Sequence, residues 1–101
     1  MKFRRVVITG LGAVTPIGND VPTYWDNLLN GVGGSAPITL FDSSAFKTHF
    51  ACEVKGFNPE EEFDRKELKK YDRYVQFALK ATREAIADSA LDVESIDPDR
   101  V

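Results

Sequence analysis

The 101-residue chain contains only one cysteine and one histidine. A single cysteine excludes an internal disulfide, and one of each is too few for a Cys/His metal site. Positive charge is not in excess either, because the net charge is −3, which argues against a nucleic-acid-binding protein. No apolar run approaches the roughly 20 residues that cross a bilayer. We therefore expect no metal, no cofactor, no nucleic acid and no membrane insertion.

The composition is that of an ordinary folded domain, with 43% hydrophobic and 29% charged residues. The length allows one small domain. A basic start over residues 1–5 is followed by an apolar stretch that is shorter than the roughly 7–15 residues of a signal-peptide core. We therefore expect a cytoplasmic protein, and the lone Cys52 fits a reducing compartment.

The first half of the chain has two clear structural signals. Residues 4–9 contain a continuous β-branched run that stops at a glycine, which predicts a strand buried on both faces, as in a parallel sheet covered by helices. A helix should begin near Asp20, with Pro22 in its first turn, and end at Gly31. Residues 32–44 are expected to form a loop, and a short strand is expected within residues 45–57.

Two helix starts follow in the second half. Asn58, with a proline next and Glu61 at the third helical position, predicts a short helix. Asp64 and Glu67 form a second capping box, and the apolar rhythm that follows predicts one long helix from Asp64 to about Ser89.

Two motifs invite a catalytic or cofactor interpretation, and both have a simpler one. Gly10 and Gly12 follow a predicted strand, but Thr15 stands where a dinucleotide fingerprint needs its third glycine, so a structural glycine turn is favoured. Cys52 lies in a predicted strand beside an acidic residue, which would raise a thiol pKa, so it is interpreted as a small buried apolar residue. His49, on the opposite face of that strand, completes no catalytic set.

A cluster of cations near the start of the long helix is harder to dismiss. Cations in a first turn oppose the helix dipole, and like charges at i, i+4 repel one another. One interpretation is a solvated helix face partly neutralised by the acids of residues 60–62 and Glu67, and the other is docking of an anionic partner. The cluster consists of Arg65, Lys66, Lys69, Lys70 and Arg73, of which the last four share one face of a continuous helix.

The ordered set of motifs resembles a known family. Residues 4–19, RRVVITGLGAVTPIGN, resemble the opening of the β-ketoacyl-acyl-carrier-protein synthases, and the similarity continues in FDSSAF at 41–46, FNP at 57–59 and KKYDRY at 69–74. The details are closer to the type II, elongating synthases. The family reads glycine near the end of the long helix, where this chain has Ala90, so we expect strain there or a different helix end.

The resemblance implies a fold, an activity and a partner. It implies an α/β, thiolase-like fold with a sheet layered between helices, of which residues 1–101 are the N-terminal portion of the first half, with no complete second domain. It implies a homodimeric acyltransferase that elongates fatty acyl chains by decarboxylative Claisen condensation. Its catalytic cysteine and two histidines match no position here, so they are expected beyond residue 101, and this chain alone is expected to be inactive.

The same resemblance gives the cationic cluster a partner. Lys66, Lys69 and Lys70 match the stretch with which type II synthases dock the acidic, phosphopantetheine-bearing acyl-carrier protein, and Arg65 and Arg73 are expected helpers. Two alternatives stay open: a stand-alone carrier-protein-binding module, and part of a catalytically dead relative of the chain-length-factor type.

Overall fold

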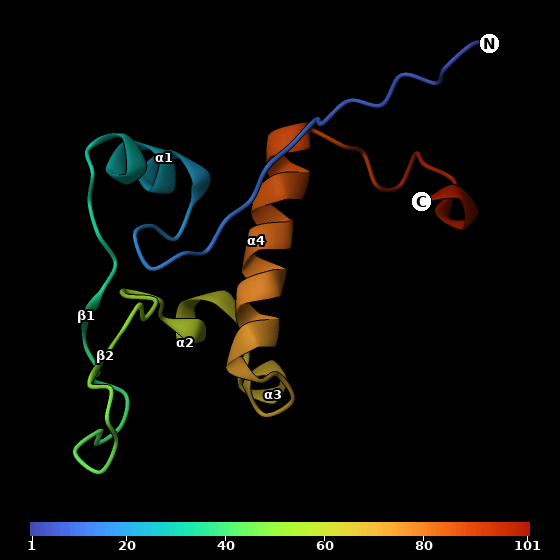
Figure 1. Ribbon diagram of the computed structural model, residues 1–101. Helices are drawn as coiled ribbons and strands as arrows, with labels where there is room; N and C mark the ends of the chain where they lie inside the picture. Colours follow the sequence, from blue (N-terminus) through green and yellow to red (C-terminus); the bar gives the residue numbers. More distant parts are fainter.

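The computed structural model describes all 101 residues as an open arrangement around one long helix (Figure 1). A two-stranded sheet and the helices within residues 20–62 lie to one side of that helix, the short helix at residues 65–68 lies at its lower end, and the C-terminal turn lies on the other side. The N-terminal segment crosses the long helix. In chain order the elements are α1 Val21–Leu29, β1 Ala36–Pro37, β2 Phe50–Ala51, α2 Pro59–Glu62, α3 Arg65–Leu68, α4 Arg73–Ser89 and the 3₁₀ turn η1 Pro98–Arg100.

Very little of the chain is buried. The accessible surface is 8563 Å², whereas a compact monomer of this mass exposes about 5,700 Å². The radius of gyration is 17.7 Å, against about 13 Å for a compact domain of this length. Only Phe63 and Gln76 are buried, and both belong to the corner where α2, α3 and α4 meet. This corner is the one place with the beginnings of a core.

The N-terminal segment is extended, but it is not a strand. Residues 4–9 have no ladder partner, and Val6, Val7 and Ile8 are 91%, 66% and 83% exposed. The prediction of a buried strand is therefore wrong for the chain as described. The physical reason is that the only sheet joins β1 to β2, so no neighbouring strand is offered to this segment.

The two glycines after this segment allow it to lie directly on α4. A Cβ at Gly10 would come within 2.2 Å of the carbonyl oxygen of Ala85, and one at Gly12 within 1.7 Å of that of Ala81. The predicted glycine turn is wrong here, because neither residue has a positive φ and the turn lies later, closed by the paired Thr15 and Gly18. These glycines are required for close approach rather than for turning.

Side chains of α4 then fix the loop that leads to α1. Glu84 accepts hydrogen bonds from the amide of Ala13 at 3.4 Å and from that of Val21 at 2.7 Å. Asp88 accepts one from the amide of Leu11 at 3.0 Å. Because Val21 is the first residue of α1, Glu84 satisfies one of the amides that a helix start leaves unpaired.

The predicted helix at residues 20–31 is confirmed as α1. Asp20 caps it by accepting from the amide of Thr23 at 2.8 Å, and this hydrogen bond lowers the pKa of Asp20 below its ordinary value. Pro22 lies in the first turn, and Gly31 follows the helix with a φ of 68°. Trp25 is 56% exposed, so the apolar face of α1 is uncovered.

The expected loop and strand between α1 and α2 form a small hairpin. β1 lies within the predicted loop and pairs antiparallel with β2, with Ala36 opposite Ala51. The carboxylate of Glu53 accepts hydrogen bonds from the hydroxyl and the amide of Thr39, which tie the two sides of the hairpin together. These hydrogen bonds lower the pKa of Glu53. Cys52 is exposed, so its predicted burial is wrong, because β2 ends at Ala51 and no element covers that face.

The long helix predicted from Asp64 to Ser89 is broken into two. α3 ends at Leu68, and α4 begins at Arg73 after Asp72, whose extended backbone marks a new helix start. Aspartate favours that position, and the apolar rhythm does not register the break because it continues on both sides. At the C-terminal end of α4, Ala90 has a φ of 52°. The backbone strain expected where the family has glycine is therefore present.

Candidate docking surface

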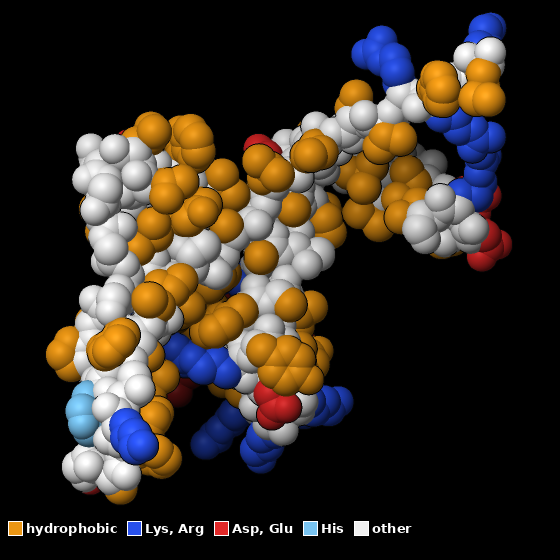
Figure 2. Space-filling model, in the orientation of Figure 1, with side chains coloured by type: hydrophobic (Ala, Val, Ile, Leu, Met, Phe, Trp, Pro, Cys, Tyr) orange, Lys and Arg blue, Asp and Glu red, His pale blue; other side chains and the backbone are white.

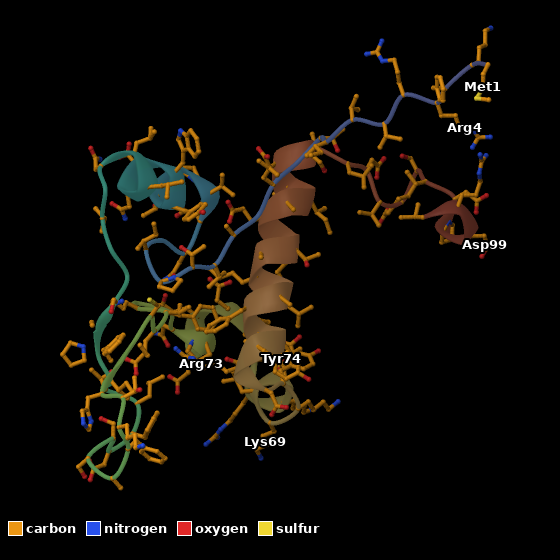
Figure 3. The ribbon with its side chains drawn as sticks, viewed as in Figure 1. Met1, Arg4, Lys69, Arg73, Tyr74 and Asp99 are labelled. Atoms are coloured by element: carbon orange, nitrogen blue, oxygen red, sulfur yellow. The ribbon has the colours of Figure 1, made fainter.

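The predicted cations surround the corner formed by α3 and the start of α4 (Figure 2). Arg65 and Lys66 open α3, Lys69 and Lys70 form the turn that follows it, and Arg73 opens α4. All five side chains are exposed. Because the helix is broken, the shared face expected for a continuous helix is replaced by a corner, where Lys69 points outward (Figure 3).

Four of the neighbouring acids accept hydrogen bonds or form an ion pair with groups outside the cationic cluster's side chains. Asp64 accepts from the amides of Lys66 and Glu67, both at 2.8 Å, while Glu67 accepts from the amide of Asp64 at 2.9 Å, which confirms this capping box. Glu61 accepts from the side-chain amide of Asn58 at 3.1 Å. Glu62 pairs with Lys80 of α4 in the one ion pair of the structure.

The cations therefore lack carboxylate partners. No carboxylate oxygen lies within ion-pair distance of Arg65, Lys66, Lys69 or Lys70, and none of their side chains donates a hydrogen bond within the chain. Of the acids expected to neutralise the cluster, Glu61 and Glu67 accept hydrogen bonds at helix starts and Glu62 pairs with Lys80, and none of them, nor Glu60, forms an ion pair with these cations. We define Arg65, Lys66, Lys69 and Lys70 as the basic corner.

Arg73 has a different environment from the basic corner. Its guanidinium carbon lies 5.0 Å from the ring centre of Phe77 and 5.9 Å from that of Phe57. The two rings meet edge to face at 5.0 Å, and Arg73 also donates to the carbonyl of Val54 at 3.5 Å. These contacts join the segment before α2 to the first turn of α4.

The corner is built on a small set of contacts that the sequence does not reveal directly. The ring of Phe63 packs edge-on against that of Tyr71 at 5.9 Å, and the guanidinium of Arg83 lies 4.8 Å from the Phe63 ring centre. Arg83 also donates to the carbonyl of Glu62 at 2.8 Å. Gln76 is the second buried residue, and no signal in the sequence marks it, because its burial depends on the packing of the corner.

The remaining candidate groups form no catalytic or metal-binding set. His49 Nδ1 lies 3.3 Å from the hydroxyl of Ser43 on the exposed hairpin, and Cys52 is not part of that contact. No group of three or more His, Cys, Asp or Glu residues could hold a metal ion. No helix combines the length and the apolar character that crossing a membrane requires.

Comparison with known proteins decides the family. Residues 3–101 match the model of the β-ketoacyl synthase N-terminal domain. The chain belongs to the β-ketoacyl synthase family. The 3-oxoacyl-[acyl-carrier-protein] synthase 2 of Staphylococcus aureus (strain COL) is 48% identical over 98 residues, which are 97% of this chain and 24% of that protein. The protein of the same name from Coxiella burnetii (strain RSA 493 / Nine Mile phase I) is 48% identical over 101 residues, or 100% of this chain and 24% of its own.

A solved structure supports the same assignment. The ishigamide ketosynthase/chain length factor superposes with a TM-score of 0.81 at 38% identity, over 92% of this chain and 23% of that one. The expected fold class, the N-terminal part of an α/β thiolase-like fold, is thereby confirmed. The chain spans about a quarter of the length of these β-ketoacyl synthase relatives.

Proposed function

We propose that this chain is the N-terminal region of a type II 3-oxoacyl-acyl-carrier-protein synthase and that its basic corner docks the acyl-carrier protein. The synthase would elongate a fatty acyl chain by decarboxylative Claisen condensation with a malonyl group carried on that protein. The relatives that share 48% identity with this chain carry the name of this enzyme class.

One observation carries the docking proposal: the basic corner has no carboxylate partner although acids are nearby. Four unpaired cations on one exposed corner attract an acidic partner and speed its approach. The carboxylates of the carrier and the phosphate of its phosphopantetheine arm would supply the missing anions. The guanidinium of Arg73 is held against two aromatic rings, so Arg73 would support docking through its charge without belonging to the basic corner.

The chemistry itself would belong to residues outside this chain. A catalytic cysteine and two histidines beyond residue 101 would carry the acyl transfer and condensation, because Cys52 and His49 form no such set. We propose a homodimeric, cytoplasmic enzyme, and a chain of residues 1–101 alone would be inactive.

The exposed apolar surface favours a region of a larger synthase over a stand-alone carrier-binding module. The segment at residues 4–9 and the apolar face of α1 are uncovered, and such surface is stable in water only when more protein covers it. A catalytically dead relative would share this surface, and the solved relative named above includes a chain length factor. The residue at the nucleophile position of the full-length protein separates these two cases.

The docking proposal is tested by measuring carrier affinity over a series of salt concentrations. Full-length protein with Lys66, Lys69 and Lys70 all changed to Gln should bind the carrier about 10- to 100-fold more weakly at low salt, because exposed charge pairs contribute roughly 0.5–1 kcal/mol each. Its affinity should also depend less steeply on salt.

Lys2→Gln is the matched control, because residue 1 lies far from Lys69 (Figure 3). It removes one positive charge, as does each of the single changes Lys66→Gln, Lys69→Gln and Lys70→Gln, and it should leave both the affinity and the salt dependence unchanged. Equal affinity of the triple variant and the control would overturn the docking proposal.

A further inference from the structure

The basic corner depends on a turn whose downstream end is tied to a buried amide. Gln76 is only 8% exposed, and its side-chain nitrogen donates to the backbone carbonyl of Tyr71 at 3.1 Å. Its own backbone amide donates to the carbonyl of Asp72, the residue that caps α4, also at 3.1 Å. A buried amide that lost its acceptor would be left unpaired, so this hydrogen bond holds Tyr71 at a fixed place beside α4.

The upstream end of the turn is fixed as well. The amides of Lys70 and Tyr71 both donate to the carbonyl of Glu67, at 2.9 and 3.0 Å. The ring of Tyr71 then packs against the buried Phe63. The backbone of Lys69 and Lys70 is therefore held between two anchored points, although their own side chains form no hydrogen bond or ion pair.

We propose that Gln76 is a positioning residue for carrier docking, acting through the Tyr71 carbonyl on the placement of Lys69 and Lys70. This inference rests on the docking function proposed above. Without the amide of Gln76, the Tyr71 carbonyl has no side-chain donor and the turn after α3 can rearrange. The two lysines then sample several directions, and binding has to select the one that fits the carrier.

Lys66 provides an internal comparison. It lies in the first turn of α3, which is fixed by the Asp64 cap and not by Tyr71. Loss of Gln76 should therefore disturb the contributions of Lys69 and Lys70 while leaving that of Lys66 intact. A general loss of stability would not discriminate among these lysines.

The first test uses hydrogen exchange on the full-length protein without any carrier. In Gln76→Leu, which replaces the carboxamide with an apolar side chain of similar size, amide exchange at Lys70 and Tyr71 should rise about tenfold, and exchange in the middle of α4 should be unchanged. If Gln76→Leu does not fold, Gln76→Asn serves instead, because it keeps the amide but shortens its reach. Unchanged exchange at Lys70 and Tyr71 would overturn the inference without touching the docking proposal.

The second test is a pair of double-mutant cycles on carrier affinity. Gln76→Leu should weaken binding about fivefold, and adding Lys70→Gln should weaken it little further, because Lys70 is already displaced. Adding Lys66→Gln to Gln76→Leu should instead weaken binding by the same further factor as Lys66→Gln does in the otherwise unaltered protein. If Lys66→Gln and Lys70→Gln each reduce the affinity of the Gln76→Leu protein by the same factor as in the unaltered protein, the positioning role is contradicted. If neither lysine change weakens binding in the otherwise unaltered protein, the docking function itself has failed.

Discussion

The close approach of the N-terminal segment to α4 makes Gly12 the most sensitive position of the loop. Replacing it with Ala would place a methyl group 1.7 Å from the carbonyl oxygen of Ala81 and 2.9 Å from the amide nitrogen of Ala85. Both obstacles are helix backbone, which cannot rotate away as a side chain can. The segment would have to lift off the helix.

The expected free-energy cost follows from these contacts. Overpacking costs about 1–3 kcal/mol. Lifting the segment also stretches the hydrogen bonds from Leu11 to Asp88 and from Ala13 to Glu84, each of which contributes about 0.5–1.5 kcal/mol. We expect Gly12→Ala to lower the free energy of unfolding by about 3 kcal/mol, taking partial relaxation into account.

Urea unfolding of the full-length protein measures this cost, and two other glycines serve as controls. Gly33 has no atom within 4 Å of an added Cβ and no positive φ, so Gly33→Ala should be neutral or slightly stabilising. Gly31 has equal space but a φ of 68°, so Gly31→Ala should cost about 1 kcal/mol from backbone strain alone. A Gly12→Ala protein as stable as Gly33→Ala would refute the close contact.

Two further predictions concern the carboxylates that hold α1. Glu84→Gln keeps the shape of the side chain but weakens its hydrogen bonds to Ala13 and Val21, so it should cost about 1 kcal/mol in urea unfolding, whereas Glu94→Gln, on an exposed segment, should cost nothing measurable. The hydrogen bond from the Thr23 amide lowers the pKa of Asp20, so its charged form stabilises the fold above the unfolded pKa, and this contribution is lost as pH falls through the lowered folded value. The stability gap between the unaltered protein and Asp20→Ala should therefore narrow as the solution is acidified below about pH 4, and a gap that widens on acidification would contradict this assignment.

The features that sequence predicted correctly depend on neighbours in the chain. The Asp20 and Asp64 caps, the proline in the first turn of α1 and Gly31 after it act within four residues of one another, so local residue preferences decide them. The cationic cluster was likewise visible, because its members are close in sequence. The family resemblance, confirmed by the comparisons, supplied the fold class that these local signals alone could not.

The features that sequence missed depend on distant parts of the protein. A β-branched run becomes a strand only when another strand pairs with it, and residues 4–9 have no such partner in this chain. The exposure of Cys52 likewise depends on what covers a two-residue strand. At the candidate site, the charges could be counted from sequence, but the pairing of Glu62 with Lys80 and the burial of Gln76 arise only when α2 packs near α4.

The central claim is that the basic corner recognises the carrier protein and not the acyl chain. The most direct measurement compares two proposed substrates of the full-length protein: malonyl-acyl-carrier protein and a malonyl thioester of pantetheine that has no carrier. Changing Lys66, Lys69 and Lys70 to Gln should raise KM for the carrier-bound substrate about tenfold or more, with kcat little changed, and should leave kcat/KM for the carrier-free substrate unaltered. Equal losses with both substrates, or no loss with either, would contradict the account.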